Sequence, residues 1–359
     1  MKNWDVIIIG GGIIGLSLAI ALRKRGVKVL VVERGEPGRE ASHAAAGMLA
    51  DLEAAVPLQS LACASARMYP EFVHELQDES GMKVDLRDQG TLLLSHADGA
   101  HTGSGFTGIT PAQLGEMEPE LRASECHIAQ LPIFYLNERS VDPAALVVAA
   151  LKATRHRKVD ISSGAAVQEV LCSGERVIGV CTDSTNYYAP VVVNCAGAWA
   201  GQVAPLQFPT RPVKGQMLAV VGGPKLRHVI RSAEVYLVPR TDGRIVIGAT
   251  VEEAGYDKRT DPDSIQRLHH AAIRLVPALA QARMLEAWAG LRPGTPDDLP
   301  ILGPTQTPGY FVATGHFRNG ILLAPITAHV MAQVVMGEKP DLDLSAFSPA
   351  RFLNATAAV

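Results

Sequence analysis

A short apolar run near the N-terminus is the clearest pattern in the chain. Residues 5–9 read as an aspartate followed by four β-branched side chains, and a glycine cluster comes directly after them. Such runs are typical of a strand buried on both faces of a parallel sheet. A segment with helical spacing continues to Gly26, and a second apolar run at residues 28–32 ends at Glu33. The pattern therefore predicts a strand–helix–strand unit.

Similar segments recur in the middle and near the end of the chain. Residues 191–200 read as an apolar strand that enters a glycine turn, and residues 309–314 as a strand that precedes a glycine-containing loop and a helix at 322–336. Further strands are expected from period-two or continuous apolar runs, and a further helix from an Asp-Pro-Asp start. These strands lie at residues 90–95, 213–221, 235–239 and 244–249, and the helix at 261–276.

The recurrence of nucleotide-domain elements at both ends and in the middle predicts a discontinuous domain. We expect the nucleotide-binding domain to comprise residues 1–85, 140–210 and 298–340. A second domain then comprises residues 86–139 and 211–297, and residues 341–359 form a C-terminal tail.

Composition excludes several classes of protein. The 359 residues carry a formal net charge of -3, with 47% hydrophobic and 19% charged residues, which indicates a folded chain. No basic run is longer than residues 155–158, so we expect no nucleic-acid partner. The five cysteines form no Cys-x-x-Cys pair, which argues against disulfides and a metal site and favours the cytoplasm. The apolar N-terminal segment is shorter than the roughly 20 residues of a membrane span, so we expect no transmembrane segment.

Residues 10–15 carry the spacing GxGxxG through Gly10, Gly12 and Gly15. In this motif the first glycine permits a tight turn, the second lets backbone amides approach a pyrophosphate, and the third lets helix and strand pack closely. The positive end of the helix dipole then faces the anion. Glu33, 18 residues after Gly15, is placed to accept a hydrogen bond from a ribose 2′-hydroxyl, which disfavours NADP. The unit therefore predicts a dinucleotide site.

The motif alone does not separate FAD from NAD. An NAD dehydrogenase would continue into a catalytic domain, whereas FAD enzymes of the glutathione-reductase type bring a later strand, here residues 191–200, back beside the first nucleotide half. The loop at residues 315–321 precedes a helix, so its free N–H groups would suit the negative charge of a reduced flavin. Both segments favour FAD.

Longer motifs resemble those of the glycine oxidases, the thiamine-pathway members of the D-amino-acid oxidase superfamily. They are GGGIIG, SHAAAGML at residues 42–49, VYLVPRTDGRIVIGAT at 235–250, WAGLRPGT at 288–295 and GHFRNGILLAP at 315–325. The resemblance covers nearly the whole chain in the same order. It implies an α/β (α+β) two-domain fold: a glutathione-reductase-type Rossmann FAD domain, and a substrate domain whose antiparallel sheet covers the flavin.

The resemblance also implies an activity. It is the oxidation of glycine or similar small amines, such as sarcosine and D-alanine, to the imine or 2-oxo acid, with oxygen reduced to hydrogen peroxide; the imine would serve thiamine biosynthesis. A homotetramer is expected on the same basis. Covalently flavinylated relatives attach FAD through a cysteine in the C-terminal half, and the last cysteine here is Cys195, so we expect non-covalent FAD.

The expected cofactor contacts combine the motif glycines, Gly197 in the later glycine turn, and positions implied by the resemblance. They are Gly10, Gly12, Ile13, Ile14, Gly15, Glu33, Arg34, Ala41, Ser42, Ala46, Gly47, Met48, Val167, Gly197, His316, Phe317, Arg318, Asn319, Gly320, Ile321 and Leu322.

The resemblance places the substrate carboxylate on Arg292, an active-site tyrosine at Tyr236 and a further substrate contact at Arg318. An arginine suits this task because its planar fork binds a carboxylate at two points and fixes its orientation. No catalytic base is required, since the flavin carries the hydride chemistry and the protein supplies position. Each residue also has a structural alternative: Arg292 as a partner of Asp297 or Asp298, Tyr236 as sheet packing, and Arg318 as a loop-holding side chain.

Other side chains were weighed in the same way. His316 is expected to hydrogen-bond within its loop, Met48 to pack beside the flavin, and Trp199 and Trp288 to belong to the core. The sequence departs from the family at Glu234, where glycine oxidases commonly have histidine. Glu234 could select the amine end of a substrate, or be an exposed residue at a strand start.

Three alternative functions stay open. The same fold could pass electrons to an acceptor other than oxygen, as in a D-amino-acid or proline dehydrogenase or the flavin subunit of a cyanide-forming glycine dehydrogenase. The chain could also be a non-catalytic flavin-binding subunit, or an NAD dehydrogenase. Residues 95–108, rich in Gly, Ser, Thr and His, are expected to change the entrance to the site.

Overall fold

The computed structural model of the chain describes residues 3–94, 105–121 and 131–352. Most of the entrance segment predicted at residues 95–108 therefore lies outside the described residues. A six-stranded sheet, with strand order β19-β20-β13-β1-β2-β9, forms the centre of one half of the molecule. Its strands are parallel except β19, which is antiparallel to β20. The strands are β1 (Val6–Ile9), β2 (Val29–Glu33), β9 (Asp160–Ser163), β13 (Val191–Asn194), β19 (Ile301–Pro304) and β20 (Tyr310–Thr314).

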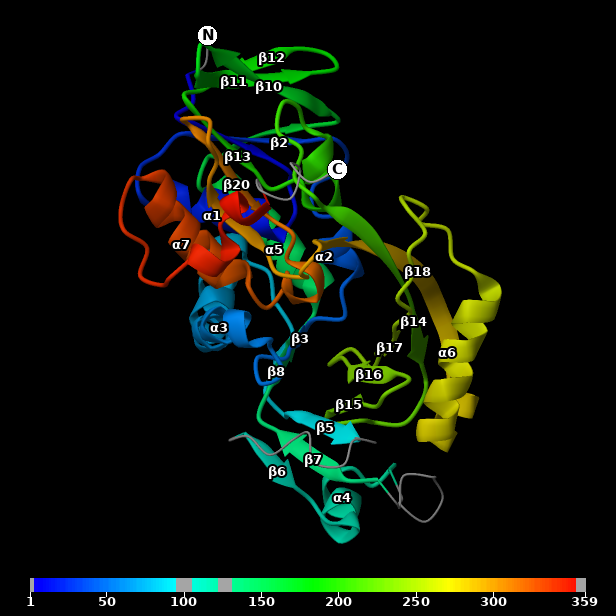
Figure 1. The fold of residues 1–359 in the computed structure, drawn as a ribbon. Helices are drawn as coiled ribbons and strands as arrows, with labels where there is room; N and C mark the ends of the chain where they lie inside the picture. Colours follow the sequence, from blue (N-terminus) through cyan, green and yellow to red (C-terminus); the bar gives the residue numbers. More distant parts are fainter. Residues whose placement is uncertain (1–2, 95–104, 122–130, 353–359) are drawn as a thin grey trace.

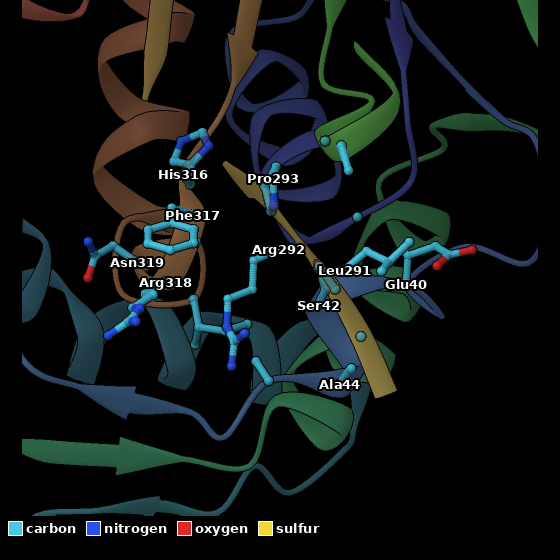
Figure 2. A pocket seen from close by; sticks show the side chains of 18 of the residues that line it. Glu40, Ser42, Ala44, Leu291, Arg292, Pro293, His316, Phe317, Arg318 and Asn319 are labelled. Carbon is cyan, nitrogen blue, oxygen red and sulfur yellow. The ribbon is translucent and has the colours of Figure 1, made fainter. Parts of the chain in front are cut away.

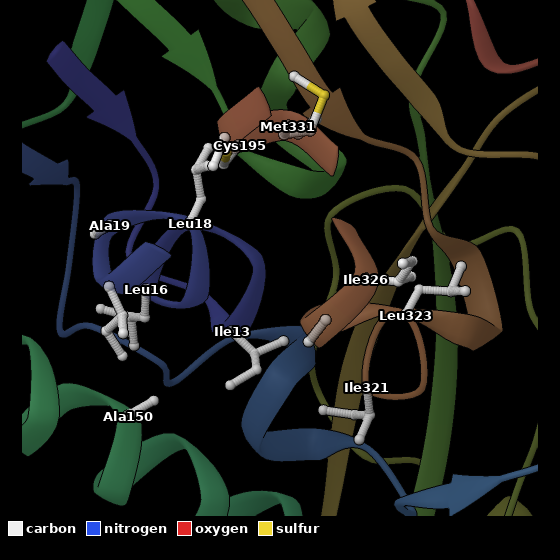
Figure 3. Packing of buried hydrophobic residues seen from close by; sticks show 14 of the residues in the cluster. Ile13, Leu16, Leu18, Ala19, Ala150, Cys195, Ile321, Leu323, Ile326 and Met331 are labelled. Carbon is white, nitrogen blue, oxygen red and sulfur yellow. The ribbon is translucent and has the colours of Figure 1, made fainter. Parts of the chain in front are cut away.

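Helices pack against this sheet and against one another. Their apolar residues, with β1 and β2, form a buried cluster that includes Leu16, Ala150 and Met331, and Figure 3 shows α1, α5 and α7 contributing side chains to it. The helices are α1 (Ile13–Lys24), α3 (Gln59–Ser80), α5 (Pro143–His156) and α7 (Ala324–Val335). Asp142 caps α5 by accepting from Ala144 N at 2.9 Å. The strand–helix–strand unit and the C-terminal helix are thus found where the sequence predicts them.

An eight-stranded sheet forms the centre of the other half, in the order β18-β14-β17-β16-β15-β5-β7-β6. The described strands pair antiparallel except β15 with β5, which are parallel. Helix α6 (Pro262–Leu275) packs on one face of the sheet, and Figure 1 shows it beside β14 and β18. The strands are β5 (Thr91–Leu94), β6 (Phe106–Gly108), β7 (Ile133–Leu136), β14 (Arg211–Val221), β15 (Val229–Arg231), β16 (Tyr236–Pro239), β17 (Ile245–Gly248) and β18 (Arg283–Gly294).

Smaller elements complete the fold. Two three-stranded sheets have the orders β3-β8-β4 and β10-β11-β12. Their strands are β3 (Met48–Leu49), β4 (Leu86–Arg87), β8 (Arg139–Val141), β10 (Val167–Ser173), β11 (Arg176–Thr182) and β12 (Asn186–Tyr188); the short helices are α2 (Ala41–Ala44) and α4 (Pro111–Met117). The 3-10 turns are Val56–Leu58, Gly197–Gln202, Pro277–Gln281, Phe317–Asn319, Ser345–Phe347 and Pro349–Phe352.

The C-terminal segment differs from a free tail. Phe347 is buried in the same apolar cluster as α1 and α7, and Arg351 forms an ion pair with Asp297 at 2.8 Å. Residues 341–352 therefore pack against the half that contains the six-stranded sheet. The domain boundaries themselves stay predictions.

Candidate cofactor and substrate site

A cavity of about 900 Å³ lies between the two large sheets. It opens at the carboxyl ends of β1, β2, β13 and β20, the edge where parallel α/β sheets bind ligands. On the other side it is lined by residues of β14, β16 and β18. All the cofactor, substrate and selectivity positions expected from the sequence line this cavity, except Gly15 and Leu322. The fold thus brings distant segments of the chain into one site.

The glycine turn after β1 leaves no room for side chains. Gly10 has a φ of +105°, and a Cβ there would lie 2.6 Å from the Cys195 carbonyl oxygen. A Cβ on Gly15 would collide with the Gly10 carbonyl and lie 3.2 Å from Ile8. Gly15 does not line the cavity, because its position lies underneath the turn; its role is the close packing of helix and strand.

The N-terminus of α1 faces the cavity through Gly12, Ile13 and Ile14. Gly12 has no side chain to cap the helix; instead Ser42 Oγ accepts from Ile13 N at 3.0 Å. The first-turn N–H groups of a helix have no acceptor within the helix, and the dipole favours an anion at this end. The turn is therefore suited to a pyrophosphate.

Glu33 has a contact that the motif does not predict. Its Oε2 accepts from Gly11 N at 2.7 Å and its Oε1 accepts from Gly35 N at 2.9 Å. The carboxylate therefore holds the glycine turn in place. Each oxygen has a further lone pair, so acceptance from a ribose hydroxyl stays compatible with these bonds.

Trp199 is not a core residue, contrary to the prediction. It is half-buried and lines the cavity. The Arg34 guanidinium stacks on its ring at 3.5 Å from the centroid, and the Tyr256 ring lies at 5.4 Å. Arg34 also forms an ion pair with Glu40 at 3.0 Å. Trp288, by contrast, packs against a buried apolar cluster although it is itself half-buried, and its indole N–H donates to Ala44 O at 3.1 Å.

The loop before α7 is fixed by buried hydrogen bonds. Tyr69 donates to Ile321 O at 2.7 Å and Ser65 donates to Leu322 O at 2.6 Å. Leu322 was predicted to contact the cofactor, but it is 1% exposed, packs in the core and does not line the cavity. His316 Nε2 bonds Thr327 Oγ1 at 3.1 Å, and burial lowers the pKa of His316 to about 3. His316 therefore forms a hydrogen bond, as the sequence predicts, but its partner lies in α7 and not in the loop.

Arg292 reaches the cavity from β18, and Arg318 from the loop before α7 (Figure 2). Arg292 Nη1 donates to Lys214 O at 3.3 Å and to Thr250 O at 3.2 Å. A Cβ on Gly215 would collide with the guanidinium, so the glycine makes room for it. Burial of the guanidinium lowers the pKa of Arg292, and neighbouring Tyr236 raises it in part. Arg292 nevertheless stays charged, as guanidinium groups do in proteins.

The two carboxylates considered as alternative partners of Arg292 have other partners. Asp297 pairs with Arg351, and Asp298 pairs with Arg211 at 3.3 Å. No ion pair to Arg292 occurs within residues 3–94, 105–121 and 131–352. The guanidinium is therefore held by neutral carbonyls, and its charge is not balanced by a bonded acid.

Tyr236 lies at the start of β16 and opposes Gly248 of β17. Its hydroxyl is 3.4 Å from Met217 Sδ, and a Cβ on Gly248 would lie 2.7 Å from this hydroxyl. Burial raises the pKa of Tyr236, while Arg292, Arg318 and Arg231 act in the opposite direction. The phenol is thus a protonated donor beside Arg292.

The remaining candidates lie at the edge of the cavity. Arg318 is exposed in this structure, with its guanidinium 5.3 Å from the Phe317 ring. Glu234 is also exposed and forms an ion pair with Arg274 of α6. This ion pair with α6 and the exposure of Glu234 favour the second interpretation, an exposed residue at a strand start.

One charged group in the cavity was missed by sequence reasoning. Arg231 of β15 lies opposite Tyr236 in register and pairs with Glu53 and, at 3.3 Å, with Glu138. Burial lowers the pKa of Arg231 to about 10 and raises that of Glu138 to about 7. No motif signals this cluster, because its members come from three distant segments.

The described residues contain neither a cluster of metal ligands nor a helix suited to span a membrane. No group of three or more His, Cys, Asp or Glu side chains there is arranged to hold a metal ion. No helix among them is both long and apolar enough to cross a bilayer.

Comparison with known proteins identifies the family. A family model described as FAD dependent oxidoreductase matches residues 5–334. The chain belongs to this family. FAD is accordingly the cofactor of this FAD-dependent oxidoreductase, and the predicted preference for FAD over NAD is confirmed.

Relatives of this oxidoreductase carry several names. It is 37% identical to the bifunctional protein ThiO/ThiG of Trichormus variabilis over 97% of its own length, but spans only 55% of that protein. It is 32% identical to the hydrogen cyanide synthase subunit HcnC of Pseudomonas aeruginosa, over 100% of this chain and 98% of that one. The crystal structure of glycine oxidase from Geobacillus kaustophilus superposes with a TM-score of 0.91 at 30% identity, covering 98% and 99% of the two chains. The resemblance and the two-domain fold class are thereby confirmed.

The cavity of this FAD-dependent oxidoreductase fits its cofactor. Gly10 and Gly12 line the cavity without side chains, and the N-terminus of α1 suits the pyrophosphate. The loop at residues 316–321, the segment around Met48, Arg292 and Tyr236 all line the same cavity. Cys195, which also lines the cavity, is buried, and burial raises the pKa of its thiol, which suppresses its reactivity.

Proposed function

We propose that the chain oxidises glycine or a similarly small primary or secondary amine, such as sarcosine or D-alanine. The product is the imine or the 2-oxo acid that it gives on hydrolysis, and oxygen is reduced to hydrogen peroxide. The observation that supports the proposal is the state of Arg292: a half-buried guanidinium, beside a tyrosine hydroxyl, held by two carbonyl groups and without a bonded acid among the described residues.

The proposed roles follow from that geometry. Nη1 of Arg292 is bonded to Lys214 O and Thr250 O, and a side-chain hydrogen bond joins Arg292 to Tyr236, so the remaining donors of its fork would bind a substrate carboxylate. Tyr236, protonated at neutral pH, would donate to the same carboxylate. FAD, when bound, supplies the two-electron chemistry. The side chains would hold the amine so that its Cα–H points at the flavin, and positioning of this kind can provide much of the rate.

The single most informative test is a substrate panel on the purified holoenzyme. Glycine, sarcosine and D-alanine are compared with ethylamine, which has no carboxylate, and peroxide and flavin bleaching are followed together. The proposal expects turnover of the amino acids and none of ethylamine. Equal activity on ethylamine would contradict a carboxylate-directed site. If no amine bleaches the flavin, the non-catalytic flavin-binding subunit becomes the better account.

A second candidate function differs in the electron acceptor. The similarity to HcnC over the whole chain supports it. It predicts bleaching by glycine, slow reoxidation by oxygen and fast turnover with an artificial acceptor such as phenazine methosulfate under anaerobic conditions. A rate of oxygen consumption, measured with an oxygen electrode, that equals the rate of flavin bleaching would exclude this second function.

Other properties stay predictions. Non-covalent FAD predicts that acid precipitation releases all the flavin into the supernatant. The homotetramer is tested by sedimentation of the holoenzyme, and the cytoplasmic location by fractionation of the cells. The use of the imine in thiamine biosynthesis predicts that loss of the gene causes a thiamine requirement.

A further inference from the structure

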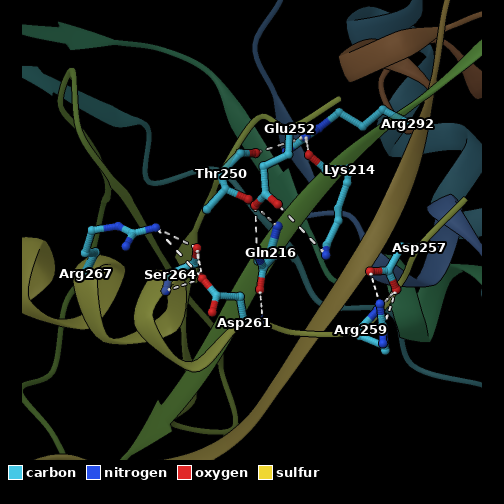
Figure 4. Close-up of polar contacts among 10 residues, drawn as sticks. All are labelled: Lys214, Gln216, Thr250, Glu252, Asp257, Arg259, Asp261, Ser264, Arg267 and Arg292. Atoms are coloured by element: carbon cyan, nitrogen blue, oxygen red, sulfur yellow. Dashed lines mark hydrogen bonds and ion pairs between the residues drawn. The ribbon is translucent and has the colours of Figure 1, made fainter. Parts of the chain in front are cut away.

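Arg292 is oriented by two backbone carbonyls that belong to neighbouring segments. Lys214 lies in β14, while Thr250 lies in the segment that follows β17 (Figure 4). Lys214 O also accepts from Glu252 N at 3.0 Å. The direction of the guanidinium therefore depends on how residues 250–252 are held against β14.

Hydrogen bonds of the backbone and of the Thr250 hydroxyl join these two segments. Lys214 N donates to Glu252 O at 2.9 Å, and Gln216 N donates to Thr250 Oγ1 at 2.9 Å. Thr250 N donates to Gln216 O at the longer distance of 3.3 Å. β17 itself ends at Gly248, and beyond it the pairing with β14 continues as a single antiparallel bridge between Lys214 and Glu252.

The Gln216 side chain adds a further restraint on this segment. It is 0% exposed; its Nε2 donates to Glu252 Oε1 at 2.7 Å and its Oε1 accepts from Asp261 N at 2.6 Å (Figure 4). One amide thus joins the two ends of the loop at residues 252–261. This loop also contacts the other half of the molecule, through Tyr256 to Ala198 O and Lys258 to Glu40.

We propose that Gln216 is a positioning residue that fixes Thr250 O against Arg292 and so sets the aim of the carboxylate-binding guanidinium. The proposal rests on the proposed role of Arg292. The Gln216 side chain makes no hydrogen bond to Arg292, and Gln216 does not line the cavity. Its effect on the position of Arg292 therefore passes through Glu252 and Thr250. Loss of the amide bonds would let residues 250–252 move from β14, and Arg292 Nη1 would lose one of its two acceptors.

The test uses an amide–carboxylate exchange. Gln216→Glu keeps the acceptor for Asp261 N but places a second carboxylate against Glu252, and the double variant Q216E/E252Q restores a donor–acceptor pair with the same net charge. Gln216→Leu removes both bonds. Arg259→Ala is the control, because Arg259 belongs to the same loop but is exposed and pairs only with Asp257 among the described residues.

The main readout is the equilibrium dissociation constant of acetate, which is followed by perturbation of the flavin absorption spectrum in each holoenzyme. We expect an increase of about tenfold in Q216E and Q216L, the size of one lost hydrogen bond, with return to within about twofold in the double variant. R259A and the flavin content of every variant should match the wild type. For glycine, KM should rise by a similar factor while kcat changes less.

Three results would overturn the proposal: unchanged acetate binding in Q216E and Q216L, an equal loss in R259A, or no recovery in the double variant. If Q216L does not fold, the Q216E and Q216E/E252Q pair still decides. Acetate binding is independent of turnover, so a wild type that binds acetate but oxidises no amine would refute the proposed function and leave this proposal intact.

Discussion

Replacing Arg292 by lysine tests how the carboxylate is held. Lysine keeps the positive charge but offers a point charge in place of the planar fork. In the structure Nη1 is committed to Lys214 O and Thr250 O, and a lysine ammonium that keeps these bonds has one donor left for the substrate. The variant therefore loses at least one of two charge-assisted bonds to the carboxylate.

The expected decrease in kcat/KM follows from the loss of that one hydrogen bond. A hydrogen bond to a charged group is worth about 1.5–3 kcal/mol, which corresponds to about a 10- to 150-fold decrease in kcat/KM. The assay is peroxide release with glycine, together with acetate binding to the oxidised holoenzyme, which should weaken by a similar factor. Flavin content and Tm should stay close to the wild type, since the cavity side of the dinucleotide turn is untouched.

A matched control is available at Arg211. This exposed arginine pairs with Glu253 and Asp298, and Arg211→Lys should leave kcat/KM within about twofold of the wild type, because exposed ion pairs contribute little. A kcat/KM for R292K that is equal to that of R211K would refute the reasoning about a bidentate site.

Three further variants probe separate parts of the account. Gly15→Ala places a Cβ against the Gly10 backbone, so we expect a lower Tm and a lower flavin-to-protein absorbance ratio, whereas Gly108→Ala, with open space around it, should change neither. Tyr236→Phe should lower kcat/KM for glycine by about 10- to 150-fold, the range for one hydrogen bond to a charged group such as the substrate carboxylate. Because burial raises the pKa of Tyr236, the ratio of wild-type to variant kcat/KM should stay constant between about pH 7 and 9. A ratio that falls towards one would show that the phenol ionises. His316 has a folded-state pKa of about 3, which is below its unfolded value. As the pH drops below about 6.5, the unfolded chain therefore binds a proton at this residue that the native chain does not bind, and the free energy of unfolding falls. Relative to His316→Gln, the wild type should lose about 1.2 kcal/mol of unfolding free energy between about pH 7 and 5.5 in urea titrations, and equal losses would contradict a buried neutral imidazole.

The parts of the fold that are encoded locally could be predicted from the sequence. The β1–α1–β2 unit depends on contiguous apolar runs and on Gly10 and Gly15, whose steric roles are visible from spacing alone. The helix at Pro262–Leu275 begins where Asp261 caps it, since Asp261 Oδ2 accepts from Ser264 N at 3.0 Å. The predicted bounds of these elements differ from the observed ones by no more than two residues, because capping and sheet pairing decide where each element ends.

Long-range contacts in the site could not be predicted in the same way. The acceptors of Arg292 are backbone carbonyls, which carry no sequence signal, and the partners of Asp297 and Asp298 come from residues 351 and 211. In the sequence Trp199 looks like an ordinary apolar residue, and only the fold shows that Arg34, which is distant in sequence, stacks on its ring. Gln216 lies within an apolar strand pattern, and only the fold shows that its amide joins both ends of a loop.

Anaerobic addition of glycine to the purified yellow holoenzyme, followed by the flavin absorbance, tests the central claim most directly. The account predicts complete bleaching that saturates with glycine concentration, and a strongly weakened response in R292K. A flavin that stays oxidised at saturating glycine, sarcosine and D-alanine, or one that bleaches equally well in R292K, would contradict it.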